Sequence, residues 1–249
     1  MNVPAFITVR SSSTRLPGKC FLPFGDVMVL EHIIHRAKHY GLDPIVCTTI
    51  DKSDDVIIDL AKKHDTKFYR GPIENKLLRW HQCCEHFSLD SFHSVDADDP
   101  FFCGHEVKRS YKLLKTGFDM VAPSPSSSNG GATVGYSLTA DIVKQASHGM
   151  NDDLDTEMIC SFIEQIPDAK KIILDDPDKS VIKDRVTLDY YEDYIFLEAV
   201  RLLIGSMGTR DELFTLLRDN PDLPKINAFR SEEWSKNQMK KIENIEIER

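Results

Sequence analysis

The strongest constraint on the fold is the alternation of short apolar segments with helical segments through the first half of the chain. Apolar runs typical of buried β-strands lie at residues 5–9, 44–49, 67–70, 91–97 and 119–122. Between them, apolar residues recur every three or four positions, as in an α-helix, most clearly from Val29 to Ala37. This order predicts a three-layer α/β protein, with helices on both faces of a mostly parallel sheet. Ligands bind such sheets at the carboxyl ends of the strands.

The second half of the chain gives fewer and shorter signals. We expect a strand at 134–138 and an apolar helix that opens at Asp189. Thr209 and Glu212 have the spacing of a capping box and predict the start of a further helix. The last twenty residues are polar, and we expect them to pack at an edge or to fray.

The domain organisation follows from length and from the absence of a linker in the sequence. The chain has 249 residues, which suits one large α/β domain, and no repeat or linker divides it. We therefore expect a single domain over 1–249. Residues 124–131 have the composition of a loop, which is either a mobile lid or a plain connector. Lid or dimerisation elements are expected within 124–185.

Composition excludes several classes of function. The net charge of −9 argues against a nucleic-acid partner, which usually meets a basic surface. No apolar run approaches the roughly 20 residues that cross a bilayer, and the N-terminus lacks the basic start of a signal peptide. The six cysteines form no C-x-x-C pair, so no zinc or redox motif is indicated. We expect a cytoplasmic protein with free thiols and no membrane partner.

Residues 10–19, R-S-S-S-T-R-L-P-G-K, follow the first strand and are the most informative segment. They hold three cations, Arg10, Arg15 and Lys19, in an acidic protein. Guanidinium and ammonium groups bind phosphate oxygens in different ways, and hydroxyls and backbone N–H groups add donors. A Walker A loop is excluded, because Ser13 and Cys20 stand where it needs glycine and a hydroxyl residue. The segment predicts a polyphosphate site; the alternative is an ordinary solvated loop.

Acidic residues end the fourth predicted strand, in the run D-A-D-D-P at 96–100. Magnesium takes one or two protein carboxylates and completes its shell with phosphate oxygens and water. Carboxylates opposite a basic phosphate loop therefore predict a site for a magnesium-bound nucleotide. A second acidic segment, R-V-T-L-D-Y-Y-E-D, occupies 185–193. Taken in isolation, Asp98 can end a strand and Asp189 can cap a helix.

Residues 10–19, continued through 22–25 and 29–32, resemble the R-x-G-S-x-R-L-P-G-K signature of cytidylyltransferases that make CMP-activated sugar acids. These include the Kdo and acylneuraminate cytidylyltransferases, and the likeness is greatest to the spore-coat-polysaccharide type. Ser12 and Ala97 stand where the family has glycine. The resemblance implies a Rossmann-like nucleotide-diphospho-sugar transferase (GT-A-like) fold. It also implies a homodimer that transfers CMP from CTP to a sugar acid, or to a related polar acceptor, in cell-surface glycan synthesis.

The same resemblance implies roles for individual residues. Lys19 and Arg10 would stabilise the triphosphate as pyrophosphate leaves, and Asp98 and Asp189 would bind Mg²⁺. The expected nucleotide-binding residues are Arg10, Ser11, Ser12, Ser13, Thr14, Arg15, Lys19, Thr48, Arg70 and Asp96.

Two other functions stay open. Asp96-Ala97-Asp98 also reads as the D-x-D motif of a metal-dependent glycosyltransferase, which uses an intact nucleotide-sugar. A non-catalytic relative that binds a nucleotide for regulation is the second alternative. The sequence leaves open the acceptor, the choice of CTP over another pyrimidine triphosphate, the number of metal ions and the dimer interface.

Overall fold

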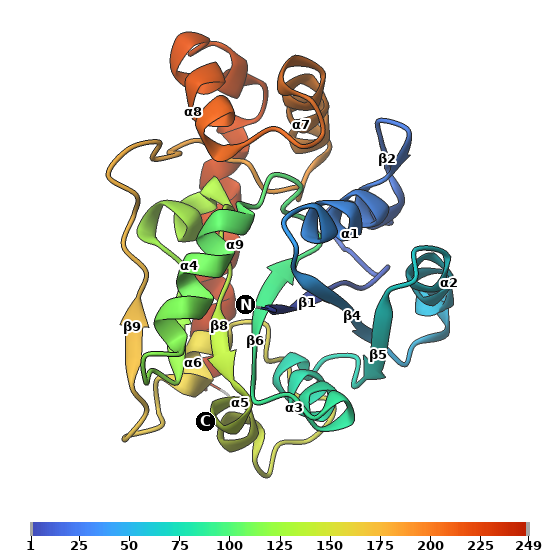
Figure 1. The fold of residues 1–249 in the computed structure, drawn as a ribbon, viewed down its shortest axis with the longest axis vertical. Coiled ribbons are helices and arrows are strands. Elements are labelled where there is room, and N and C mark those ends of the chain that lie inside the picture. The colour runs from blue at the N-terminus through green and yellow to red at the C-terminus, as the bar shows by residue number, and fades with distance from the viewer. Residues whose placement is uncertain (1, 248–249) are drawn as a thin grey trace.

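The structure is a computed structural model that describes residues 2–247, with side chains through residue 240. Within this part of the chain, a seven-stranded sheet has the order β5-β4-β1-β6-β8-β7-β9 (Figure 1). Its strands are β1 (Pro4–Thr8), β4 (Asp43–Thr49), β5 (Lys67–Gly71), β6 (Ser91–Asp96), β7 (Met120–Ala122), β8 (Ser137–Thr139) and β9 (Lys171–Ile173). β2 (Pro23–Phe24) and β3 (Val27–Met28) form a separate hairpin.

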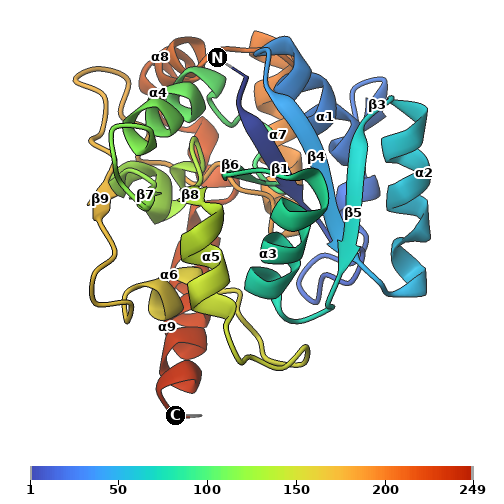
Figure 2. The ribbon, with the colours of Figure 1, turned by 60° about the horizontal axis from the view of Figure 1, so that its bottom comes forward.

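Helices cover both faces of the sheet (Figure 2). The α-helices are α1 (Val29–His39), α2 (Asp55–Lys63), α3 (Lys76–Phe87), α4 (Gly104–Leu114), α5 (Ala140–Ser147), α6 (Ile159–Ile163), α7 (Tyr191–Ile204), α8 (Arg210–Asp219) and α9 (Ser231–Ile247). Side chains of α1, α2, α4, α7 and α8 share one core with Ala5 and Ile7 of β1. Phe6 points to the opposite face, into a second core with α3, α5 and α6. This alternation along β1 is the two-residue period of a strand buried on both sides.

The observed sheet confirms the predicted three-layer, mostly parallel architecture. β1 pairs in parallel with β4 and β6, and β4 pairs in parallel with β5. β8 runs antiparallel to both β6 and β7. The strand expected at 134–138 is β8 at Ser137–Thr139, a shift of a few residues. Residues 231–247, in the polar tail expected to pack at an edge or to fray, form a helix.

The turn before β8 brings the cleft-facing chain close to β6. Gly135 lies so near that a Cβ there would stand 2.2 Å from the Ser94 carbonyl oxygen, so a larger residue would displace one of the two segments. The loop predicted at 124–131 contains a turn at Ser127–Gly131. Ser127 Oγ accepts hydrogen bonds from the backbone N–H groups of Thr133 and Val134, at 3.0 Å each. These bonds close the segment on itself ahead of β8.

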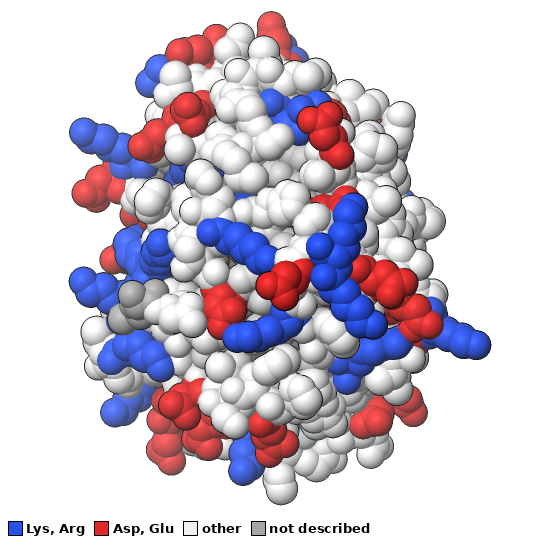
Figure 3. Space-filling model, turned by 45° about the vertical axis from the view of Figure 1, so that its right-hand side comes forward, with Lys and Arg blue, Asp and Glu red and all other residues white. Residues whose placement is uncertain are grey.

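Among the described residues, no helix has both the length and the apolar character needed to cross a membrane. The charged side chains on the face shown in Figure 3 are mixed in sign, with basic and acidic groups interspersed. The six cysteines are free thiols, and all but Cys160 are buried.

Candidate functional site

A cleft of about 830 Å³ opens at the carboxyl ends of β1 and β6, within the size range of small-molecule sites. Its walls come from residues far apart in the sequence: 8–20, 96–99, 127–136, 155–160, 187–189 and 234–239 all contribute. The two segments singled out in the sequence, the basic loop and the acidic run after β6, face the same cavity. They meet there because β1 and β6 are parallel neighbours and end at the same edge.

Lys19 joins these segments, because its ammonium lies between two carboxylates. Lys19 Nζ is 2.6 Å from Asp98 Oδ2 and 2.9 Å from Asp189 Oδ1, and it donates to the Leu188 carbonyl at 2.8 Å. Burial would lower the pKa of Lys19, but the two carboxylates outweigh burial and raise it above its ordinary value. Lys19 is therefore a full cation at the centre of the cleft.

Asp189 receives a second cation from the loop. Arg15 Nη2 donates to Asp189 Oδ1 at 2.6 Å. Burial would raise the pKa of Asp189, but Lys19 and Arg15 lower it to about 2. Asp98 differs, because burial and the neighbouring carboxylates raise its pKa against the attraction of Lys19. Asp189 is thus the more firmly ionised of the two carboxylates.

A buried ion-pair network holds Asp189 from behind. The Arg185 guanidinium contacts Asp193 twice, at 2.9 Å through Nε and 2.9 Å through Nη2. Arg185 Nη2 also donates to Asp189 Oδ2 at 3.2 Å. Asp193 accepts further bonds from the backbone N–H of Asp189 and from Asn227. The two oxygens of Asp189 therefore face different ways, Oδ1 toward the basic loop and Oδ2 toward Arg185.

The start of the basic loop is anchored by Asp54, which is 1% exposed. Asp54 accepts from Ser11 through the backbone N–H at 2.8 Å and through Oγ at 2.6 Å. Its other oxygen accepts from Thr48 Oγ1 at 3.0 Å and Thr49 Oγ1 at 2.5 Å. Burial would raise the pKa of Asp54, but the bonds from Ser11 and Thr49 lower it. A buried carboxylate therefore ties the loop to the end of β4.

The remaining cations of the cleft lie beside β6 and the start of α3. Arg10 Nη1 pairs with Glu74 at 3.1 Å, and Lys76 Nζ pairs with Asp96 at 3.3 Å. Arg79 is buried beneath them and donates to the Pro72 carbonyl at 2.6 Å. The cations therefore gather on the side of the cleft that the first hundred residues build.

The structure brings most of the predicted site residues together. The cleft is lined by Arg10, Ser12, Ser13, Thr14, Arg15, Lys19, Asp96, Asp98 and Asp189. Three predicted nucleotide-binding residues lie outside its lining. Ser11 and Thr48 bind Asp54, and Arg70 binds Asp55 at 2.6 Å together with two backbone carbonyls of 49–51. Their polar groups therefore support neighbouring segments of the site.

Sequence reasoning missed Asp54, Arg185, Asp193 and the C-terminal helix as parts of the site. A signal existed for the network behind Asp189, because one cation, Arg185, and two carboxylates, Asp189 and Asp193, recur every four residues. Asp54 gave no such signal, since an aspartate just before a helix usually reads as a cap.

The carboxylates fit a divalent cation. Asp98 Oδ2 and Asp189 Oδ1 converge on one point, where the Lys19 ammonium now supplies the positive charge. Among the described residues, no group of three or more His, Cys, Asp or Glu side chains is arranged to hold a metal. Two carboxylates suit Mg²⁺ bound to a nucleotide, because phosphate oxygens and water complete that shell.

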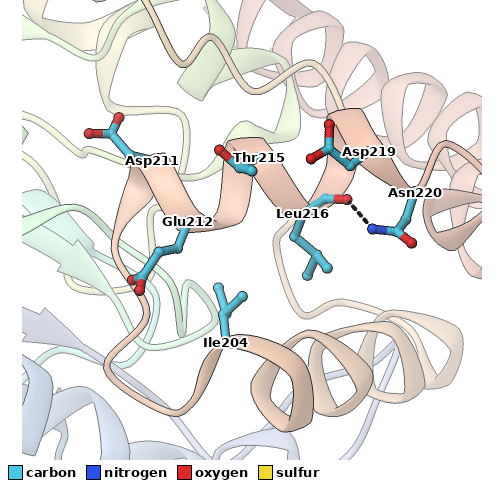
Figure 4. Close-up of a pocket in the computed structure, with 7 residues that line it drawn as sticks. All are labelled: Ile204, Asp211, Glu212, Thr215, Leu216, Asp219 and Asn220. Carbon is cyan, nitrogen blue, oxygen red and sulfur yellow. Dashed lines mark hydrogen bonds between the residues drawn. The ribbon is translucent and has the colours of Figure 1, made fainter.

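A second hollow, of about 470 Å³, lies between the end of α7 and α8. Figure 4 shows Asp211, Glu212, Thr215, Leu216 and Asp219 of α8 around it, with Asn220 just after the helix and Ile204 opposite. Its charged side chains are carboxylates, which repel a polyphosphate, and it lies away from the strand ends. We therefore place the functional site in the larger cleft.

Comparison with known proteins finds related sequences and structures. A model of the cytidylyltransferase family matches residues 5–154, more than half of the chain. The spore coat polysaccharide biosynthesis protein SpsF of Bacillus subtilis (strain 168) is 27% identical over 234 residues, which cover 87% of this chain and 94% of that protein.

Solved structures share the fold. A cytidylyltransferase from Leptospira borgpetersenii serovar Hardjo-bovis (strain JB197) has a TM-score of 0.77 at 20% identity, over 90% of this chain and 96% of that one. CMP:2-keto-3-deoxy-manno-octonic acid synthetase, solved with CTP, has a TM-score of 0.60 at 13% identity, over 82% and 99%. Rv0371c of Mycobacterium tuberculosis H37Rv, solved with manganese, has a TM-score of 0.54 at 13% identity, over 80% and 99%.

Proposed function

The chain belongs to the cytidylyltransferase family and is a nucleotidyltransferase enzyme, and from that premise we propose that it transfers CMP from CTP to a hydroxyl of a sugar acid or a related polar acceptor. The acceptor oxygen attacks the α-phosphorus and forms the new P–O bond. The bond from the α-phosphorus to the bridging oxygen breaks, pyrophosphate leaves, and the hydroxyl proton passes to solvent. Such a reaction depends mainly on positioning and on stabilising charge.

The observation that carries this proposal is the arrangement around Lys19. A fully charged ammonium, two more loop cations and two converging carboxylates share one cleft of nucleotide size. The loop cations match a triphosphate. Lys19 and Arg10 stabilise its charge as pyrophosphate leaves, and Arg15 holds the loop against Asp189.

The other loop residues have supporting roles in this proposal. Ser12, Ser13 and Thr14 line the cleft and offer donors to the phosphates, and Asp96 lies on the nucleotide side. Ser11, Thr48 and Arg70 act indirectly, by holding the loop and the end of β4 through their carboxylate partners.

We extend the proposal to a divalent metal, Mg²⁺, held by Asp98 and Asp189. The manganese complex of Rv0371c supports a divalent ion in this fold. When bound, the ion supplies positive charge to the phosphate oxygens. CTP as the nucleotide is supported by the family match and by the CTP complex of the Kdo-activating synthetase. SpsF supports an acceptor destined for a surface polysaccharide.

Two finer points complete the proposal. A homodimer is what the family resemblance implies. A cytoplasmic location is supported by the six free thiols and by CTP as the substrate.

The direct test measures pyrophosphate release with Mg²⁺ and each of the four nucleoside triphosphates, against a panel of sugar acids and sugar phosphates. We expect release that needs both CTP and one acceptor. Consumption of an intact nucleotide-sugar without pyrophosphate would favour the glycosyltransferase alternative. Tight CTP binding without turnover on any acceptor would favour the regulatory alternative, and no CTP binding would overturn the proposal.

Replacing Lys19 by Ala separates chemistry from folding. We expect kcat/KM to fall by about a hundredfold or more, as when a charge-stabilising donor is removed. Arg15 still pairs with Asp189 in this variant, so the fold should survive. Lys112→Ala, on the exposed side of α4, is the matched control and should keep full activity. Inactivation of Lys19→Ala that only parallels its unfolding would contradict the catalytic role.

A further inference from the structure

One wall of the cleft includes a helix outside the family match. The match ends at residue 154, whereas α9 begins at Ser231. Trp234, Ser235, Asn237, Gln238 and Met239 of α9 line the cleft. Trp234, Asn237 and Gln238 are spaced three and four residues apart, which places them on one face of the helix. α9 runs beside α6 in both ribbon views (Figures 1 and 2).

The inner face of α9 is fixed to the segment that carries Asp189. The Arg185 guanidinium lies over the Trp234 ring, 5.2 Å from its centroid. Asn237 Nδ2 donates to the Tyr190 hydroxyl at 3.4 Å, and Arg230 pairs with Glu192 at 3.0 Å. α9 therefore contacts the same Arg185 that orients Asp189.

The chemistry of this wall differs from that of the basic loop. Besides the indole of Trp234 and the amides of Asn237 and Gln238, the lining nearby includes the Tyr136 hydroxyl, which contacts Cys160 Sγ at 2.9 Å, and the Asp155 and Glu157 carboxylates. Glu157 also lies 4.0 Å from Arg10 Nη2. Amide, hydroxyl and carboxylate groups bind hydroxyl groups as donors and acceptors. An aromatic face packs against the apolar face of a ring. This combination suits a polyhydroxylated ring better than a polyphosphate.

The direction of the reaction gives this wall a role. In an in-line displacement, the attacking oxygen approaches opposite the leaving group. Pyrophosphate leaves on the side of Arg10, Arg15 and Lys19. The attacking acceptor must therefore approach from another part of the cleft lining, of which the α9 residues are an uncharged helical part.

We propose that α9 forms the acceptor site, with the Trp234 indole against the acceptor ring and Asn237 and Gln238 bound to its hydroxyls. The ligand class is a polyhydroxylated sugar ring. This inference rests on the proposed function, since it assigns the second substrate of that reaction.

Tryptophan fluorescence tests the site directly. The sequence has two tryptophans; Trp80 is 0% exposed, whereas Trp234 is partly exposed in the cleft. Acrylamide quenching therefore reports mainly on Trp234, and Trp234→Phe provides the background. The probes are CMP and CMP-N-acetylneuraminate, because the CMP part anchors both and only the second carries a sugar. We expect CMP-N-acetylneuraminate to lower the acrylamide quenching constant of Trp234 about twofold further than CMP does. The reason is that a ligand buried in a pocket shields from solvent the side chains that it contacts.

The second test measures steady-state kinetics with the acceptor that the pyrophosphate panel identifies. If no acceptor in the panel gives pyrophosphate release, the affinity for CMP-N-acetylneuraminate is measured instead. Trp234→Ala and Gln238→Ala should each raise the acceptor KM, or the probe Kd relative to CMP, by about tenfold or more, as for anchor residues in interfaces. The Kd for CTP should stay within about twofold of wild type. Lys236→Ala lies on the exposed side of the same helix and should change neither.

The outcomes separate the two proposals. If the wild type binds neither CTP nor CMP, both the proposed function and this inference are wrong. Normal CTP binding, with no effect of Gln238→Ala on the acceptor, would overturn the inference alone. Equal weakening of CTP and acceptor by Trp234→Ala and Gln238→Ala would also overturn it, because the wall would then belong to the nucleotide.

Discussion

Replacing Arg185 by Met tests whether Asp189 depends on the buried charges behind it. Met keeps most of the side-chain length and removes the guanidinium. The change breaks two contacts of 2.9 Å to Asp193 and one of 3.2 Å to Asp189. Asp193 is 0% exposed, so water cannot replace the lost partner. We expect both the stability and the metal dependence of the enzyme to change.

The size of the effect follows from burial. Removing one partner of a buried ion pair costs about 3–5 kcal/mol. Asn227 and the backbone N–H of Asp189 still donate to Asp193, so we expect the lower end, about 3 kcal/mol. In a chain of this length that lowers Tm by about 6 °C or more. Asp189 also loses the group that orients Oδ2, and the Mg²⁺ concentration for half-maximal activity should rise about tenfold.

Urea unfolding of Arg185→Met, Asp193→Asn and the double variant measures the coupling. Each single variant removes the same contacts between Arg185 and Asp193. The double variant should therefore lose about 2 kcal/mol less free energy of unfolding than the sum of the two single losses. Arg218→Met breaks an exposed ion pair with Asp219 and should leave stability nearly unchanged. A cost for Arg185→Met as small as this control, or additive single losses, would refute the reasoning. Unchanged Mg²⁺ dependence in a folded Arg185→Met would refute the orienting role.

Two further predictions concern other buried groups. Asp54→Asn replaces an acceptor-only carboxylate that fixes the basic loop, so calorimetry should find CTP bound about tenfold more weakly. The control Asp59→Asn, on the exposed side of α2, should bind CTP normally, and equal affinities of the two variants would exclude the anchoring role. Burial lowers the pKa of His93 to about 3. Below pH 6.5, the unfolded chain therefore takes up a proton at His93 that the folded chain does not. As a result, the free energy of unfolding falls by about 1.4 kcal/mol for each pH unit. Urea unfolding at pH 6.5 and pH 5 should show a shallower loss for His93→Gln than for wild type or for the exposed His39→Gln, and equal losses would contradict the shift.

The parallel half of the sheet was predictable because its strands are apolar runs separated by periodic helices. The core strand β1 alternates Ala5, Phe6 and Ile7 between two cores, a pattern that helices on both faces require. β9 has three residues and α6 has five, which is too short for periodicity to identify them. α9 escaped prediction as a helix because its sequence is polar, and most of its described side chains are exposed.

The site was predictable where strand ends and charge coincide. The basic loop and Asp98 follow neighbouring parallel strands, so the sheet brings them together. The metal-binding role of Asp189 was predicted from the family resemblance. The sequence pattern alone does not show that residue 189 lies next to Arg15 in the fold. Arg70 and Thr48 show the limit of short matches. Both stand at strand ends as predicted, yet their polar groups bind Asp55 and Asp54 rather than line the cleft.

The ion pair between Arg15 and Asp189 has a consequence for synthesis of the chain. Its partners are 174 residues apart, and a ribosome adds about 5–20 residues per second. Arg15 is therefore made about ten seconds or more before the carboxylate with which it pairs. Arg10 and Lys19 have earlier partners in Glu74 and Asp98, so the late carboxylate matters most for Arg15. A chain stopped before residue 189 leaves the Arg15 guanidinium without its carboxylate, and we expect such a chain to bind polyanions more strongly than the full chain does.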